Sequence, residues 1–179
     1  MGMYRYDYLP HYTYEDYLNW EGRWELIDGI PYAMSPAPMI RHQAVSHKIA
    51  WQLQVLLENC ENCKALLPVD WKIDDSTIVQ PDNLVICHDP DNEAYLTRAP
   101  SVIFEILSKS TALIDRNLKY DLYEKEGVAY YIIVDPQEEI AKVYKLRGGR
   151  YIKLLDAHKE KADFDLGECS FVFDFEKIW

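Results

Sequence analysis

Two acidic residues lie inside short apolar runs, and this feature limits the possible folds most strongly. Asp82 lies in the run from Thr77 to Cys87, and Glu105 lies in the run from Ser101 to Leu107. Runs of this length, bounded by turn residues, are typical of buried strands. A carboxylate buried without a partner is costly. Two carboxylates on neighbouring strands are a common way to hold a divalent cation, so we expect Asp82 and Glu105 to share one.

The rest of the chain predicts a mixed sheet with helices on its faces. Hydrophobic periodicity and turn residues give the expected elements: a short helix after Thr13, a hairpin over 23–34 turning at Asp28-Gly29, a helix over 40–59, strands over 66–73, 78–87, 102–107 and 130–134, a helix over 112–126, a hairpin of strands 141–146 and 151–155, and a strand over 170–173. We expect a single α/β (mixed α+β) domain over residues 1–179. Its strands 102–107 and 130–134 should be parallel, joined by a right-handed helical crossover.

Composition narrows the class of protein. No run approaches the roughly 18 apolar residues that span a bilayer, and the first residues have no secretory pattern, so we expect a cytoplasmic protein without a membrane segment. The net charge of −11 argues against a general nucleic-acid coating protein. Cys60 and Cys63 form a C-x-x-C pair without a matching second pair. We expect four reduced thiols, with metal or redox chemistry as the alternative.

Other polar residues could join the two acids, although each has a simpler explanation. Lys119 shares a helix face with Asp115, beside the apolar stripe 114–118–122, so its amine could reach Glu105. The alternative is an exposed Asp–Lys pair. Asp82 alone could cap a turn, and Glu105 could pair with a buried Lys or Arg.

The two histidines of the helix over 40–59 are also candidates. His42 and His47 are five residues apart, which is the wrong spacing for two ligands on one helix face. His47 could hydrogen-bond a carboxylate or a phosphate, and we favour it over His42 for a role in the site.

Several short motifs, weak one by one, follow each other in a characteristic order. They are Trp24-Glu25-Leu26-Ile27-Asp28-Gly29, Ser35-Pro36, His42, His47, Pro81-Asp82, Glu105-Ile106-Leu107-Ser108, Ser110-Thr111, Asp115-x-x-x-Lys119-x-x-x-Tyr123 and Gly127 to Pro136. In this order, over residues 12 to 145, the chain resembles the Uma-type family of restriction-endonuclease-like proteins. That family belongs to the PD-(D/E)XK nuclease superfamily.

The resemblance implies a restriction-endonuclease-like fold and a phosphodiesterase site that uses Mg²⁺, or Mn²⁺ in its place. Asp82 matches the family's "PD" aspartate, and Glu105 matches the acid of "(D/E)XK". Leu107 stands where the motif lysine is expected, and Lys119 on the next helix takes the place of that lysine. Glu25 matches the family's upstream glutamate and would be a further metal ligand. Without the resemblance, Glu25 could simply pair across its hairpin.

The resemblance also implies a nucleic-acid substrate, DNA before RNA, and a homodimer. Candidate dimer contacts are the strand over 30–34 and the tyrosine-rich segment 4–17. The alternatives are a nuclease-fold module that has lost turnover and binds nucleic acid or a protein, and a metallohydrolase that acts on another substrate. The acidic charge and the missing motif lysine favour the module.

Overall fold

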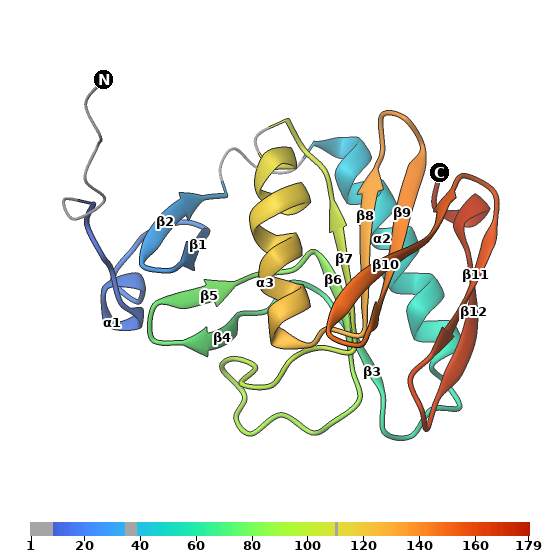
Figure 1. Cartoon of the computed structure of the whole chain (residues 1–179), viewed down its shortest axis with the longest axis horizontal. Helices are drawn as coiled ribbons and strands as arrows, with labels where there is room; N and C mark the ends of the chain where they lie inside the picture. The colour runs from blue at the N-terminus through green and yellow to red at the C-terminus, as the bar shows by residue number, and fades with distance from the viewer. Residues whose placement is uncertain (1–8, 35–38, 110) are drawn as a thin grey trace.

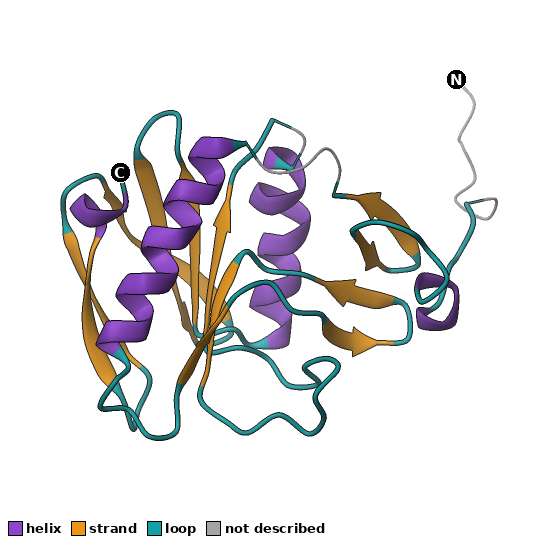
Figure 2. Cartoon of the chain, turned by 180° about the vertical axis from the view of Figure 1, so that it is seen from behind, coloured by secondary structure: helices purple, strands orange, loops and turns teal. Residues whose placement is uncertain are grey.

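The chain folds around a central sheet with a helix on each face (Figures 1 and 2). The computed structural model describes residues 9–34, 39–109 and 111–179. The sequence features at Ser35-Pro36, at Ser110 and in the tyrosine-rich segment before residue 9 lie outside these ranges. No helix in the described ranges has the length and apolar character that crossing a membrane requires.

The described strands form two main sheets and a separate pair. The six-stranded sheet has the order β10 (Arg150–Ala157), β9 (Ile140–Arg147), β8 (Tyr130–Asp135), β7 (Val102–Ile106), β6 (Asn83–Ile86), β3 (Lys64–Leu66). The four-stranded sheet has the order β2 (Ile30–Ala33), β1 (Trp24–Ile27), β5 (Thr77–Val79), β4 (Trp71–Asp74). As expected, β7 and β8 are parallel, and the helical segment after β7 connects them.

Each face of the six-stranded sheet has its own apolar core. Helix α2 (Ile40–Leu56) packs through Val45, Ile49 and Leu53 against the face that carries Phe104 and Ile106. The pair β11 (Lys161–Asp165) and β12 (Ser170–Asp174) completes that layer. Helix α3 (Lys119–Glu126) lies on the opposite face, which is the side of Figure 1 nearer the viewer. Residues of β7 alternate between the two faces.

The predicted turn at Asp28-Gly29 and the predicted helix ends are present in the structure. Asp28 and Gly29 both have positive φ, of 50° and 75°, as the two-residue turn between β1 and β2 requires. Helix α1 (Tyr14–Tyr17) begins after Thr13, whose backbone N–H donates to Asp16. Helix α3 ends at Gly127, which has a left-handed φ of 84°.

Two predicted strands are each divided in the structure. The run over 78–87 does not form one strand, because β5 ends at Val79 in one sheet and β6 begins at Asn83 in the other. Pro81 has no N–H to donate to a ladder, and the segment 80–82 is the point where the chain crosses between the sheets. The run over 66–73 likewise divides into β3 and β4. Strand β11 was not predicted.

The helix over 112–126 exists but has a different buried face. It contains a π-helical segment, Ile114–Leu118, before α3. Asp115, Lys119 and Tyr123 form the fully buried stripe, whereas the predicted apolar stripe 114–118–122 is only partly buried. The polar stripe faces the sheet because partners for it are present there.

The expectation of four reduced thiols was wrong for this structure. Disulfides join Cys60 to Cys169 and Cys63 to Cys87. The register of β3 against β6 pairs Lys64 with Ile86, so Cys63 and Cys87 face each other one position further along. Cys60 lies in the turn after α2, beside the turn between β11 and β12 that carries Cys169. The first bond therefore ties the turn after α2 to the β11–β12 pair, and the second joins the residues that flank the adjacent strands β3 and β6.

Candidate active site

The buried amine of Lys119 lies among three carboxylates. Its Nζ atom is 2.9 Å from Oε1 of Glu25, 3.0 Å from Oε1 of Glu105 and 3.3 Å from Oδ1 of Asp115. These four side chains are at most 4% exposed. The alternative of an exposed Asp115–Lys119 pair is therefore wrong. The three acids come from β1, β7 and the π-helical segment, so the cluster joins three elements that are far apart in the sequence.

Strand β7 directs Glu105 toward α3 because its neighbours two residues away, Ile103 and Leu107, pack in the core on that side. The carboxylate accepts a hydrogen bond of 2.7 Å from the hydroxyl of Tyr123, as well as the bond from Lys119. Lys119 and Tyr123 are four residues apart on one helix, so one helix face supplies both donors. These contacts fix the orientation of the Glu105 side chain.

Glu25 does not pair across its own hairpin. Its Oε1 atom accepts from the backbone N–H of Gln80 at 2.7 Å and from Lys119. Gln80 belongs to the segment that crosses between the two sheets, and β1 pairs with β5 just before it. The same connection therefore brings Glu25 from the small sheet to the edge of the large one.

Asp82 lies in the crossing segment, directly opposite Glu105. The register of β6 against β7 pairs Asn83 with Phe104, and the next pair along would be Asp82 with Glu105. Its Oδ2 atom accepts from the backbone N–H of Ile106 at 2.8 Å and lies 3.3 Å from Nε2 of His42. The side chain of Asp82 is 13% exposed, more than any of the four clustered side chains. The structure thus brings all four sequence-predicted site residues to one end of β7.

Burial and mutual repulsion shift the titration of this cluster. Burial raises the pKa of Glu105 well above its ordinary value, and Asp115, Asp82 and Glu25 raise it further, against the opposing effect of Lys119. The pKa values of Glu25 and Asp115 are raised too, first by burial. Burial alone would lower the pKa of Lys119, but Glu105 and Glu25 outweigh it and raise this pKa well above the usual value. The ammonium group of Lys119 is therefore the one positive charge that interacts with all three carboxyl groups around it.

The acids of this site are of the type that a hard divalent cation prefers, although the described residues do not arrange them around a cation position. Glu25, Asp82, Glu105 and Asp115 supply carboxylate oxygens, and one ammonium group cannot balance their charge. Oδ1 of Asp115 is buried and has no hydrogen-bond partner, although Lys119 lies nearby. In the described residues, no three His, Cys, Asp or Glu side chains stand ready-arranged as a ligand set, because Lys119 occupies the space between the acids.

His42, rather than His47, is the histidine at this site. His42 is buried on α2 and contacts Asp82, whereas His47 lies on the exposed side of the helix. The preference for His47 as the residue that supports a carboxylate was therefore wrong. Sequence reasoning also missed Tyr123 as a partner of Glu105 and Asp115 as a member of the cluster. Their spacing from Lys119, four residues to either side, was the available signal.

Comparisons with known proteins identify the fold and the family of the chain. A crystal structure from Anabaena variabilis, described as a putative nuclease belonging to DUF820, superimposes with a TM-score of 0.73 at 17% sequence identity. The alignment covers 93% of this chain and 96% of that one. No functionally curated protein matches the chain. The model of the Uma2 family, described as "Putative restriction endonuclease", matches residues 13–164. The chain therefore belongs to the Uma2 family of restriction-endonuclease-like proteins.

Proposed function

We propose that this protein is a Mg²⁺-dependent endonuclease that hydrolyses phosphodiester bonds in DNA. One observation carries the proposal: Lys119 lies 3.0 Å from Glu105, with Glu25 and Asp115 around the same amine. Membership of a family described as restriction endonucleases supports the same chemistry. Leu107 stands where the motif usually has a lysine. Lys119, on the next helix, supplies an amine to Glu105 instead.

Asp82 and Glu105, with Glu25 as a third ligand, would hold the cation. Bound there, Mg²⁺ supplies an activated water and neutralises charge on the scissile phosphate. Lys119 orients the attacking water and stabilises the negative charge that develops on the phosphate. Tyr123 keeps Glu105 in position through its 2.7 Å hydrogen bond. In-line attack leaves a 5′-phosphate and a 3′-hydroxyl.

The contact between Lys119 and Glu105 also argues against a module that has lost turnover. The amine that the motif lacks at Leu107 is present beside the acid, where it could act on a bound phosphate. The net charge of −11 counts less against the enzyme because three of the acids surround Lys119 and Asp82 lies beside them.

We also propose that the protein works as a homodimer, because two strands need two sites. A cytoplasmic location, which a DNA substrate favours, conflicts with the two disulfides of the structure. Light scattering in solution tests the dimer. Rapid alkylation of thiols in intact cells tests the compartment, because disulfides are rare in reducing cytosol. Four alkylated cysteines per chain would agree with a cytoplasmic protein, whereas two intact disulfides would point to an oxidising compartment.

The decisive experiment compares isosteric variants for nicking of supercoiled plasmid with Mg²⁺ or Mn²⁺. We expect Asp82→Asn and Glu105→Gln to lose cleavage and to bind Mg²⁺ more weakly by calorimetry. Asp163→Asn, which alters an exposed acid on β11, is the matched control and should cleave like wild type. Undiminished cleavage by Glu105→Gln would refute the assignment. Hydrolysis of small phosphodiesters without polynucleotide cleavage would instead favour the metallohydrolase alternative.

A further inference from the structure

The buried acids can be approached from one side, that of Asp82. Glu25, Glu105, Asp115 and Lys119 are nearly inaccessible, whereas Asp82 retains some exposure beside His42. Immediately on this side lies a cavity of about 200 Å³, several times the roughly 30 Å³ of a water. His42 lines the cavity and contacts Asp82, so it forms the wall between the two.

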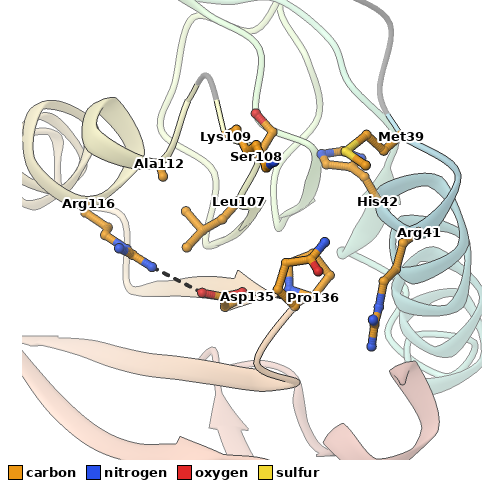
Figure 3. A pocket seen from close by; sticks show the side chains of 11 residues that line it. Met39, Arg41, His42, Leu107, Ser108, Lys109, Ala112, Arg116, Asp135 and Pro136 are labelled. Atoms are coloured by element: carbon orange, nitrogen blue, oxygen red, sulfur yellow. Dashed lines mark hydrogen bonds and ion pairs between the residues drawn. The ribbon is translucent and has the colours of Figure 1, made fainter.

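The cavity lies where the parallel strands β7 and β8 end. Leu107 follows β7, while Asp135 and Pro136 lie at the end of β8, and all three line the cavity (Figure 3). Ligands of α/β proteins commonly bind beyond the carboxyl ends of parallel strands. The position therefore suits a substrate that extends past Glu105, which is two residues before Leu107.

Positive side chains surround this cavity in an otherwise acidic protein. Arg41, Lys109 and Arg116 all line it, against one lining acid, Asp135. Arg116 pairs with Asp135 at 3.2 Å, and Arg41 pairs with Glu139 at 2.6 Å. Within the part of the chain that the structure describes, Lys109 has no ion-pair partner. The cavity thus retains positive charge for an anion.

The remaining lining suits the rest of a nucleotide. Leu107, Ala112 and Pro136 give the cavity apolar walls against which a sugar ring could pack. His42 is 9% exposed, and its Nδ1 atom is buried without a hydrogen-bond partner. A buried polar atom without a partner is uncommon in proteins, and a polar group bound at this wall would supply one.

We propose that this cavity binds the phosphate and sugar of the nucleotide next to the scissile bond, with Lys109 and Arg116 as the phosphate contacts. The inference rests on the proposed function, since it names where the substrate strand continues. In Figure 3, Lys109 lies above Leu107 and Arg116 lies to its left, with its ion pair to Asp135, so the two side chains reach the cavity from different parts of its wall. They bind and position the strand and take no part in the reaction.

The test measures binding without cleavage. A fluorescent single-stranded oligonucleotide is titrated in EDTA, so that no metal is present, over a series of salt concentrations. Wild type is compared with Lys109→Gln/Arg116→Gln. Each neutralised phosphate contributes roughly 0.7 to the salt slope on single strands, and the two side chains share one phosphate, so the double variant should lower the slope by about 0.7. Binding of thymidine 5′-monophosphate, but not thymidine, should weaken in parallel.

Arg147→Gln is the matched control. Arg147 is an exposed cation at the far end of β9, whereas Ile140 at the other end pairs with Asp135 beside the cavity. The salt slope of the Arg147→Gln variant should equal that of wild type. Arg116→Lys keeps a cation and should recover part of the lost affinity, which loss of fold would not allow. Thermal melting of each variant checks that it is folded.

The outcomes separate this inference from the nuclease assignment. In cleavage assays, the double variant should raise KM and leave kcat unchanged, as expected for lost uniform binding. An unchanged salt slope and affinity in the double variant would overturn the cavity proposal even if wild type cleaves DNA. Conversely, weakened binding in the variant with no cleavage by wild type would support the cavity and refute the nuclease.

Discussion

The two faces of strand β7 have opposite chemistry. On the side of α2, Phe104 lies in a layer of aromatic rings, 5.2 Å from the ring of Phe173. On the side of α3, Glu105 lies in a buried group of acids around one amine. The first face is stabilised by burial of apolar area. On the second face, burial of the acids and of Lys119 costs free energy, which their pairing only partly offsets. One strand thus separates an aromatic layer from a buried charged cluster, which is the site that we propose for catalysis.

Removal of the central amine should have the largest effect. Lys119→Met leaves Glu25, Glu105 and Asp115 buried without their cation, which should lower the free energy of unfolding by about 3–5 kcal/mol. The rate of DNA cleavage should fall by about 10²–10³-fold. Denaturant titration and plasmid nicking measure the two effects. The double variant Lys119→Met/Glu105→Gln should regain stability and stay inactive, and a cleaving double variant would contradict the role of both groups.

Truncation of an aromatic side chain on the α2 side of the sheet should affect stability but not the rate of cleavage. Phe173→Ala leaves a cavity in the aromatic layer and should lower the free energy of unfolding by about 3–5 kcal/mol. Phe173 is fully buried on β12 and is not among the residues around Lys119. Cleavage per folded molecule, measured well below the melting temperature, should match that of wild type. A rate loss as large as that of Lys119→Met would show that the two faces are not independent.

The disulfide that spans 109 residues should contribute less than either face. Cys169→Ser opens this loop and should lower the free energy of unfolding by about 2–4 kcal/mol, a range typical of native disulfides. Both disulfides lie on the α2 side, at the end of that helix, so cleavage at low temperature should persist. Calorimetric melting with and without reductant checks the loss. An equal melting temperature in both conditions would mean that the bonds do not form in solution.

Per pH unit, the smallest effect on stability is a pH dependence specific to the acidic face. Because the pKa of Glu105 is raised in the folded protein, its protonation favours folding below the ordinary value, and this contribution is lost as pH rises through the raised pKa. From about pH 5 to 8, metal-free wild type should lose stability relative to Glu105→Gln, by at most about 1.4 kcal/mol per pH unit. Added Mg²⁺ should reduce the difference. Parallel stability curves for the two proteins would contradict the shift.

Local patterns were sufficient to predict much of the fold. The parallel pair β7 and β8, helix α2, and the Asp28-Gly29 turn follow from apolar periodicity and from residues suited to positive φ. Pro81 was a signal for the division at Gln80-Pro81-Asp82, because proline is disfavoured inside a central strand. Both flanking segments are equally apolar, however, and only the sheet topology shows that they join different sheets. The cysteine pairing was equally inaccessible, since four cysteines allow three connectivities.

The sequence predicted four residues of the candidate site, but it did not predict the roles of Asp115, Tyr123 and His42 or the packing of the site. Asp82 and Glu105 stood out as acids in apolar runs, while Lys119 and Glu25 depended on the resemblance to a family. The stripes 114–118–122 and 115–119–123 have the same spacing and lie on adjacent faces, so periodicity could not decide which one is buried. The sheet decides it, because Glu105 offers Lys119 and Tyr123 partners that an apolar stripe could not use.

The segment Gln80-Pro81-Asp82 has one more consequence. At one end, the N–H of Gln80 holds Glu25 of the small sheet, and at the other end Asp82 is held by Ile106 of the large sheet. These three consecutive residues therefore fix the distance between Glu25 of the small sheet and the end of β7 in the large one. An inserted or deleted residue here would misalign the carboxylates while leaving each sheet internally intact, so the length of this segment is itself a functional constraint.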